Sequence, residues 1–410
     1  MLSHGNKPDS ALSTLEHPPG SYQGWVIRLA PRDLLRTMYL ILRPKTGDFG
    51  DWRDVSGGIA AASYPHLEGT TDYPNSGSLN ILSADGLLYI DPALPFAEKG
   101  LIKTIRRRAG NPRGTVHLGI GDDCAVLRIS RGHEALVTTD FSLEGVHFRR
   151  EWHPPQSVGH RCLARGLSDI AAMGGIPVAA FLSLALPRKL PQRWVDEFIS
   201  GLLRLASQYR VSLAGGDTAE SRSGVLADVV VVGSIPRDKA ILRSGAKPGD
   251  RIFVTGELGG AAAVLDKLFS GRKLRPRDHP RHFYPEPRLQ VGRMLREKNL
   301  ASAMIDLSDG LSTDLSHICE ESRVGAEIIV KGLPAARLGG KPVAPQFVLH
   351  GGEDYELLFT APAAKRIPSR IAGVPISQIG RIVRGKKIHV LNEDGTRTEL
   401  RAEGWQHFQR

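Results

Sequence analysis

Four short acidic motifs, spread over residues 119–310, constrain the fold of this chain more than any other feature. Each places aspartate beside glycine or serine, where the local pattern predicts that the chain leaves a strand or enters a helix. The motifs are Gly119-Ile120-Gly121-Asp122-Asp123, Leu167-Ser168-Asp169, Gly215-Gly216-Asp217 and Asp306-Leu307-Ser308-Asp309-Gly310. Aspartates gathered from separate elements supply the hard oxygen ligands that Mg²⁺ shares with substrate phosphates. The motifs therefore predict a fold that brings these carboxylates together for phosphoryl transfer.

The chain changes character near residue 96. Residues 1–95 are rich in Gly, Pro, Ser and Asp and show weak periodicity. We interpret them as a poorly ordered N-terminal extension, with a small appended element as the alternative. From residue 96 onward strand and helix patterns alternate, and a turn cluster at 247–250 separates two blocks. We expect an α/β (α+β type) fold of mixed sheets flanked by helices, with an N-terminal domain over 96–247 and a C-terminal domain over 248–410.

Two predicted strands carry motif residues at their ends. The pattern predicts a strand over 135–139 that ends at Asp140, and a short strand over 211–214 that leads into Gly215-Gly216-Asp217. A helix predicted over 156–173 contains Asp169. We therefore expect the carboxylates to meet where these elements end.

The composition argues against nucleic-acid binding, membrane association and a cysteine-based metal or disulfide site. The net charge is +11, but the basic residues are scattered and no aromatic-rich module accompanies them, so we expect no nucleic-acid partner. No apolar run approaches the roughly 18 residues that span a membrane, and the first residues lack the apolar core of a signal peptide. We expect no membrane association and a cytoplasmic location. The three cysteines lie far apart, which argues against a zinc site or a disulfide framework.

The first half of the chain offers candidate metal ligands. In Asp122-Asp123 the adjacent side chains point opposite ways, so one carboxylate should face the site while the other braces the turn. The next strand delivers Thr138-Thr139-Asp140, which suits one metal and its waters. Asp169 lies on a helix rich in Ala, Leu and Gly, where an unpaired charge is costly. Its partner is either a metal or an arginine such as Arg161 or Arg165.

The remaining motifs suit phosphate and a cationic ligand. The glycines of Gly215-Gly216-Asp217 allow the backbone to approach phosphate closely. Asp306-Leu307-Ser308-Asp309 precedes a helix, and N-capping alone would need one of its three polar residues. Residues 243–247 place a basic pair around glycine, as for a nucleotide phosphate or a solvated linker. Residues 349–359 combine three acids with a tyrosine, which suits a planar cation.

Together these residues resemble the thiamine-monophosphate kinase family of the aminoimidazole-ribonucleotide-synthetase-like superfamily. The resemblance runs from about Phe96 to Phe408 and adds four further stretches to the motifs above. They are Glu144-Gly145-Val146-His147-Phe148, Arg243-Ser244-Gly245-Ala246, Gly352-Glu353-Asp354-Tyr355-Glu356-Leu357 and Gly404-Trp405-Gln406-His407-Phe408. The resemblance implies the two-domain fold of that superfamily and a homodimer joined through the N-terminal halves. It also implies direct in-line phosphorylation of thiamine monophosphate by ATP with Mg²⁺, without a covalent catalytic nucleophile.

The resemblance also assigns roles to individual residues. Eight would hold Mg²⁺, namely Asp123, Thr138, Thr139, Asp140, Asp169, Asp217, Asp306 and Asp309. Four would contact ATP, namely Gly216, Asp217, Arg243 and Ser308. Three would contact thiamine monophosphate, namely His147, Glu353 and Trp405. Asp122 and Asp354 are interpreted as structural braces.

The chain departs from the family pattern at three places. They are Phe141-Ser142-Leu143-Glu144, Gly166 before the Leu-Ser-Asp motif, and Ala219-Glu220 after Asp217. One alternative is a sister ATP-using enzyme of the superfamily, such as aminoimidazole ribonucleotide synthetase or selenophosphate synthetase. The latter would need a reactive cysteine near the start of the conserved region, and residues 96–123 contain none. Another alternative is an inactive binding homologue, against which the retained aspartates argue.

Overall fold

The computed structural model describes residues 98–120, 124–392 and 394–405, together with four short strands nearer the N-terminus. The chain divides into two compact units, 1–95 and 96–410. The described residues of the first unit form one antiparallel sheet in the order β1-β2-β3-β4. Its strands are β1 (Trp25–Ile27), β2 (Met38–Leu40), β3 (Asn80–Ser83) and β4 (Gly86–Tyr89). Most of the predicted extension lies outside the described residues.

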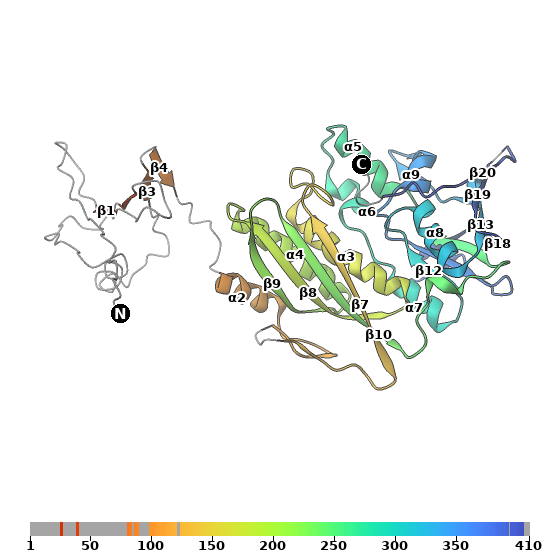
Figure 1. Ribbon diagram of the computed structural model, residues 1–410, viewed down its shortest axis with the longest axis horizontal. Helices are drawn as coiled ribbons and strands as arrows, with labels where there is room; N and C mark the ends of the chain where they lie inside the picture. Colours follow the sequence, from red (N-terminus) through yellow and green to blue (C-terminus); the bar gives the residue numbers. More distant parts are fainter. Residues whose placement is uncertain are drawn as a thin grey trace, which may run out of the picture. The chain divides into compact units, whose positions relative to one another are not determined.

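The first sheet of the second unit has four strands in the order β7-β10-β8-β9 (Figure 1). Its strands are β7 (His133–Leu143), β8 (Ile176–Pro187), β9 (Ser212–Ser221) and β10 (Leu226–Pro236). The β8–β9 pair is parallel and the others are antiparallel, so the sheet is mixed. Before it come α2 (Glu98–Ala109) and a short hairpin of β5 (Val116–Leu118) and β6 (Val126–Leu127).

Two helices, α3 (Pro155–Ala172) and α4 (Gln192–Gln208), pack against this sheet and against each other. Their crossing is close because each contributes a glycine at the contact. A Cβ added at Gly159 would lie 2.0 Å from the carbonyl oxygen of Phe198, and one at Gly201 would lie 1.9 Å from that of Gln156. The glycines of the two helices therefore fix how near α3 and α4 approach.

The second sheet follows in the order β12-β16-β11-β18-β13-β19-β20, with β17 paired to β18. Its strands are β11 (Arg251–Thr255), β12 (Ala303–Asp306), β13 (Gly325–Ile329), β16 (Leu357–Ala361), β17 (Arg370–Ile371), β18 (Val374–Val383), β19 (Ile388–Leu391) and β20 (Arg397–Glu399). The accompanying helices are α5 (Gly260–Phe269), α6 (Pro280–Phe283), α7 (Leu289–Glu297), α8 (Leu311–Ser322) and α9 (Pro345–His350). Mixed sheets flanked by helices confirm the predicted fold class.

Helix α3 is shared by both halves of this unit. Its buried side chains Leu163, Leu167 and Ile170 belong to one hydrophobic core with Val229 of the first sheet and Phe359 of the second. That core holds the helix against both sheets at once. No helix in the described part of the chain is both long and apolar enough to cross a membrane.

Two strand boundaries differ from those predicted. Strand β9 continues to Ser221 instead of ending near residue 214, so Gly216 and Asp217 lie inside a strand. Glycine permits this because a Cβ at Gly216, which has a φ of 148°, would lie 1.9 Å from the carbonyl oxygen of Leu182 on β8. Likewise β7 runs to Leu143, three residues beyond Asp140. Both motifs belong to extended backbone, where successive side chains face opposite sides of the sheet.

Candidate active site

Helix α3 presents four polar side chains, which we call the α3 polar face: Arg161, Arg165, Ser168 and Asp169. The spacing of four, three and one residues brings them to one side of the helix. Arg161 and Ser168 are buried, although they are polar. Buried polar groups are retained where partners satisfy them, and here the partners come from three other elements.

Three carboxylates meet at the Asp169 end of this face and form what we call the carboxylate cluster. They are Asp140 on β7, Asp169 on α3 and Asp306 at the end of β12. The Thr138 hydroxyl donates a hydrogen bond to Asp169, and the Ser168 hydroxyl donates one to Asp306 over 2.7 Å. The structure thus brings together four of the eight predicted metal ligands from two sheets and a helix.

The carboxylate cluster carries more negative charge than its surroundings neutralise. Burial and the neighbouring Asp169 raise the pKa of Asp140 to about 7. Burial also raises the pKa of Asp169, and burial together with Asp169 raises that of Asp306 well above its usual value. Carboxylates respond in this way when several of them share one site. The donors are all oxygens, so the residues present fit a hard divalent cation such as Mg²⁺.

Two arginines approach the carboxylate cluster. Arg165 favours ionisation of Asp140 and so lowers its pKa. Arg243 has the same effect on Asp169, and it lies in the short turn η1 (Arg243–Gly245) between the two sheets. The predicted nucleotide contact Arg243 therefore lies near the predicted metal ligand Asp169, although these two residues are 74 positions apart in the sequence.

At the other end of the α3 polar face, Glu353 is held by two arginines. Arg161 donates to it over 2.7 Å and Arg165 over 3.0 Å. Although burial opposes ionisation, these arginines hold the pKa of Glu353 well below its usual range. Both arginines also line a small recess that contains the predicted substrate residue His147. The sequence analysis named Arg161 and Arg165 as possible partners of Asp169. It did not predict their ion pairs with Glu353.

The loop after β12 pairs with the segment that carries Glu353. The Glu353 amide donates to the Ser308 carbonyl over 2.8 Å, and the Tyr355 amide donates to the Leu307 carbonyl over 2.9 Å. Glu353 and Tyr355 have φ values of 66° and 50°. Such left-handed conformations cost about 1–3 kcal/mol for residues other than glycine and are concentrated at functional sites. This pairing fixes Ser308 next to Glu353.

Trp405 lies against the same loop. Its amide donates to the Asp309 carbonyl over 3.0 Å, and its side chain is 54% exposed. The preceding Gly404 admits this approach, because a Cβ there would lie 2.2 Å from the Asp309 carbonyl oxygen. The structure thus gathers the predicted residues Ser308, Asp309, Glu353 and Trp405 around the start of α8.

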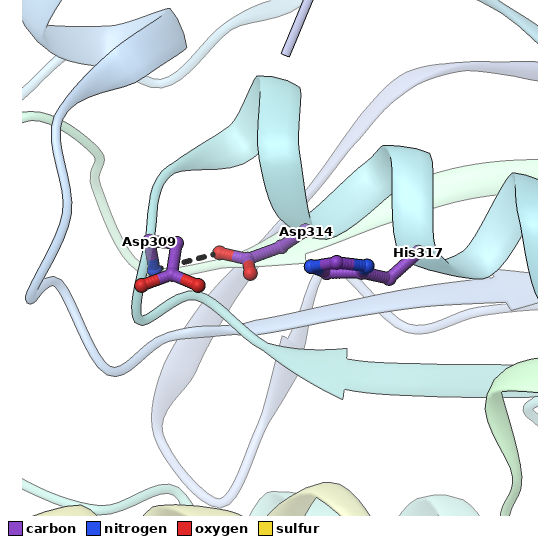
Figure 2. Close-up of side chains that lie close together, drawn as sticks. All are labelled: Asp309, Asp314 and His317. Carbon is purple, nitrogen blue, oxygen red and sulfur yellow. Dashed lines mark hydrogen bonds between the residues drawn. The ribbon is translucent and has the colours of Figure 1, made fainter. Parts of the chain in front are cut away.

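Asp309 also belongs to a group that sequence reasoning missed. One ligand atom from each of Asp309, Asp314 and His317 lies within 4.8 Å of the others, and Figure 2 shows the Asp314 carboxylate between the other two side chains. Asp314 accepts the amide hydrogens of Asp309 (3.1 Å) and Gly310 (3.0 Å). Burial and Asp309 raise the pKa of Asp314 to about 7. Asp314 therefore shapes the Asp309 loop from the first turn of α8.

Two predicted ligands lie away from the carboxylate cluster. Thr139 faces the opposite side of β7 from Asp140, and its hydroxyl donates to Asp228 on β10 over 2.7 Å. Asp217 is exposed and pairs in register with Ser183 of β8, which in turn pairs with Asp228. These residues therefore share the outer face of the first sheet. Asp228 belongs to none of the motifs, and the sequence did not predict it as a site residue. The one indication in the sequence is that it is a single acidic residue beside a run of valines.

Three further residues of the motifs complete the account. Asp354 accepts the Gly259 amide hydrogen over 2.6 Å at the start of α5, which is the bracing role expected for it. Asp122 and the predicted metal ligand Asp123 lie outside the described residues.

Comparison with known proteins identifies the class. Models for the N-terminal and C-terminal domains of AIR synthase related proteins match residues 121–235 and 247–391. The chain is 37% identical to the thiamine-monophosphate kinase of Escherichia coli (strain K12), over 76% of this chain and 98% of that protein. It is also 37% identical to the thiamine-monophosphate kinase of Bacillus subtilis (strain 168), over 72% of this chain and 94% of that protein.

Comparison with solved structures points to the same family as these relatives. Thiamine-monophosphate kinase from Stenotrophomonas maltophilia K279a matches with a TM-score of 0.65 and 37% identity, over 73% of this chain and 97% of that chain. A structure described as AaThiL complexed with AMPPCP and TMP matches with a TM-score of 0.60 and 32% identity, over 76% and 97%. The fold and the carboxylate cluster thus define an AIR synthase related protein with two α/β domains. Within that class, the chain belongs to the thiamine-monophosphate kinase family, which confirms the resemblance seen in the sequence.

The raised pKa of Asp140 predicts how stability depends on pH without metal. Its ordinary value is 3.8 and its folded value is about 7, so the stabilisation from proton binding is complete below about pH 4 and is lost as pH approaches 7. In EDTA, Asp140→Asn should raise the free energy of unfolding at pH 8 by about 1 kcal/mol or more. It should also flatten the fall in stability between pH 5 and pH 8.

Urea denaturation followed by circular dichroism measures this effect. Asp266→Asn, which alters an exposed carboxylate on α5, is the control and should leave the pH dependence unchanged. If Asp140→Asn destabilises the protein at pH 8, charge repulsion in the carboxylate cluster is refuted.

Proposed function

We propose that this chain transfers the terminal phosphoryl group of ATP to thiamine monophosphate, giving ADP and thiamine diphosphate, with Mg²⁺. The observation that carries the proposal is the carboxylate cluster, in which burial and mutual repulsion raise the pKa values of Asp140 and Asp306. Such a site binds divalent cations and, through them, phosphates. The relatives' names supply the reaction, and the AaThiL structure is described as complexed with AMPPCP and TMP.

Asp140, Asp169, Asp306 and Thr138 would hold Mg²⁺ in the carboxylate cluster, where the structure brings them together. When bound, the metal neutralises charge on the transferring phosphoryl group. We assign Asp123, Thr139, Asp217 and Asp309 to the same metal set on the family resemblance. The phosphate of thiamine monophosphate is itself the acceptor, so the protein needs to supply position and charge but no covalent nucleophile.

The nucleotide contacts are assigned to Arg243, Gly216, Asp217 and Ser308. Arg243 supports this role most directly, because it lies close enough to Asp169 to lower its pKa and can place a permanent positive charge beside the phosphates. Ser308 lies just before α8, where its hydroxyl can donate to a phosphate, whereas the Asp309 and Gly310 amides already donate to Asp314.

The thiamine contacts are assigned to His147, Glu353 and Trp405. The exposed indole of Trp405 offers a face on which a cationic ring can stack. Glu353 remains ionised between Arg161 and Arg165, so it can accept a hydrogen bond from an amino group. His147 lines the same recess as these arginines.

The alternatives receive less support. Hydrogenase maturation protein HypE matches with a TM-score of 0.63 but only 18% identity, which shows a shared fold alone. An inactive homologue would have no need to keep three mutually repelling carboxylates, of which Asp306 is buried and Asp140 and Asp169 are half-buried. The requirement for ATP also favours the cytoplasmic location that the sequence predicts.

Asp169→Asn should abolish most turnover while preserving the fold. Asp169 lies between Asp140 and Asp306, and metal charge contributes several kcal/mol to such transition states, so we expect a loss of about 100-fold or more. The measurement is thiamine diphosphate formed from ATP and thiamine monophosphate with saturating Mg²⁺. Asp266→Asn should keep full activity. Unchanged turnover in Asp169→Asn would remove Asp169 from the metal set, and inactivity of the folded wild type would refute the proposed function.

Trp405→Ala should weaken binding of thiamine monophosphate specifically. Loss of a cation–π contact costs about 0.5–2 kcal/mol, so KM for thiamine monophosphate should rise about 2- to 30-fold while KM for ATP stays nearly constant. Trp405→Phe, which keeps an aromatic face, should restore most of the affinity. Equal increases in both KM values would instead indicate a structural role at the Asp309 loop.

We further propose that the chain forms a homodimer through the outer face of the first sheet. On β7, Val137 is 66% exposed and Phe141 is 56% exposed, which is unusual for large apolar side chains on a long strand. Thr139 and Asp217 lie on the same face, so dimer formation there would enclose them.

Sedimentation equilibrium should therefore give twice the chain mass. Phe141→Asp should shift the protein toward monomer, because a charge in an apolar interface is poorly tolerated. Phe269→Asp, at a comparably exposed phenylalanine on α5, is the control and should remain dimeric. A monomeric wild type would refute this assembly.

A further inference from the structure

A second concave site lies at the end of α2, apart from the carboxylate cluster. It is a cavity of about 400 Å³ between the last turns of α2, the end of β5 and the start of β9. That volume falls within the range of small-molecule sites, about 300–1,000 Å³. None of Asp140, Asp169 or Asp306 lines it. The described lining therefore does not include the carboxylate cluster, although Gly119 and Ile120 belong to the motif that ends in Asp123.

The walls of this cavity are strongly basic. Lys103, Arg106 and Arg107 line it from α2, and their spacing of three and four residues places them on one side of the helix. Among the residues that the structure describes, no Asp or Glu lines it. In the part of the chain that the structure describes, none of the three lies within ion-pair distance of a carboxylate, whereas the adjacent Arg108 pairs with Asp196 over 3.3 Å. Three like charges around one hollow favour an anion that neutralises them together.

Apart from Asn111, the other described lining residues are apolar or glycine, among them Leu118, Ile120 and Leu213. Leu118 is 38% exposed although it is a large hydrophobic residue, whereas Leu213 is largely buried in the core. An inorganic anion would leave this apolar surface in contact with water. A phosphorylated molecule with a ring would cover it and gain the corresponding hydrophobic free energy.

We propose that this basic pocket binds a small molecule that carries two or more phosphate groups and a ring, such as a nucleoside diphosphate, without a divalent metal. Lys103, Arg106 and Arg107 hold the phosphates, while Leu118 and Ile120 contact the ring. The carboxylate cluster repels free polyanions and needs a metal to bind phosphate. The two sites therefore differ in their response to EDTA.

Isothermal titration calorimetry on the full chain in EDTA tests the pocket, with ADP and inorganic pyrophosphate as probes. Both should bind, and ADP should bind several-fold more tightly because its ring covers the apolar lining. The triple variant Lys103→Gln/Arg106→Gln/Arg107→Gln should weaken ADP binding by about 10-fold or more, since it removes three charge-assisted contacts. Asp169→Asn should bind ADP as the wild type does.

A matched control removes one lysine and two exposed arginines elsewhere in the same domain. Arg188→Gln/Lys189→Gln/Arg193→Gln changes the net charge equally and should keep the affinity. Leu118→Asp tests the site from another element and should also weaken ADP binding. The proposal is overturned if neither probe binds in EDTA, or if the control loses as much affinity as the α2 triple variant. Equal affinity for ADP and pyrophosphate would refute the contact with the ring.

Discussion

The burial of a polar helix face is the constraint on which the rest of this structure depends. Helix α3 packs between two sheets, and its side toward the second sheet carries Arg161, Arg165, Ser168 and Asp169. Buried charges are costly unless they are paired, so each of these residues requires a partner from a distant segment. Glu353, Tyr355 and Asp306 supply hydrogen bonds from the C-terminal part. The same contacts that satisfy α3 therefore position the two halves of the site.

The two ends of this helix face solve the charge problem differently. At the Arg161 end the chain provides its own counter-charge, and Glu353 stays ionised because two arginines hold its pKa low. At the Asp169 end the three carboxylates outnumber Arg165 and Arg243, and burial and Asp169 raise the pKa of Asp140 to about 7. Under the proposed function, the Arg161 end would contact the substrate and the Asp169 end would bind Mg²⁺. The two would then be separated by about two turns of one helix.

Sequence reasoning predicted the fold class and the identity of the motif residues better than their placement. Aspartate beside glycine is visible in a sequence, and so Asp140, Asp169 and Asp306 were found. A sequence does not show which side chains pair across nearly 190 residues. For this reason Arg165 was considered as a partner of Asp169 and not of Glu353. Asp314 and His317 also escaped notice, because a polar residue in the first turns of a helix looks like ordinary capping. The extent of β9 was underestimated because the glycines of its motif resemble a turn, while parallel pairing with β8 carries the strand through them.

The alternation of side chains along a strand decides which motif residues can reach the carboxylate cluster, and the motifs themselves do not show this. Consecutive residues in a strand face opposite sides, so Thr138 and Asp140 reach the carboxylate cluster while Thr139 points to Asp228 on the outer face. Gly216 lies in the row of paired residues that includes Asp140, and Asp217 lies in the next row, with its side chain on that outer face. A single metal position within one chain therefore does not gather all the residues that the family resemblance assigns. Thr139 and Asp217 lie on the outer face of the sheet, where β7 also exposes Val137 and Phe141. A role for them in the proposed reaction therefore depends on a second subunit that covers this face.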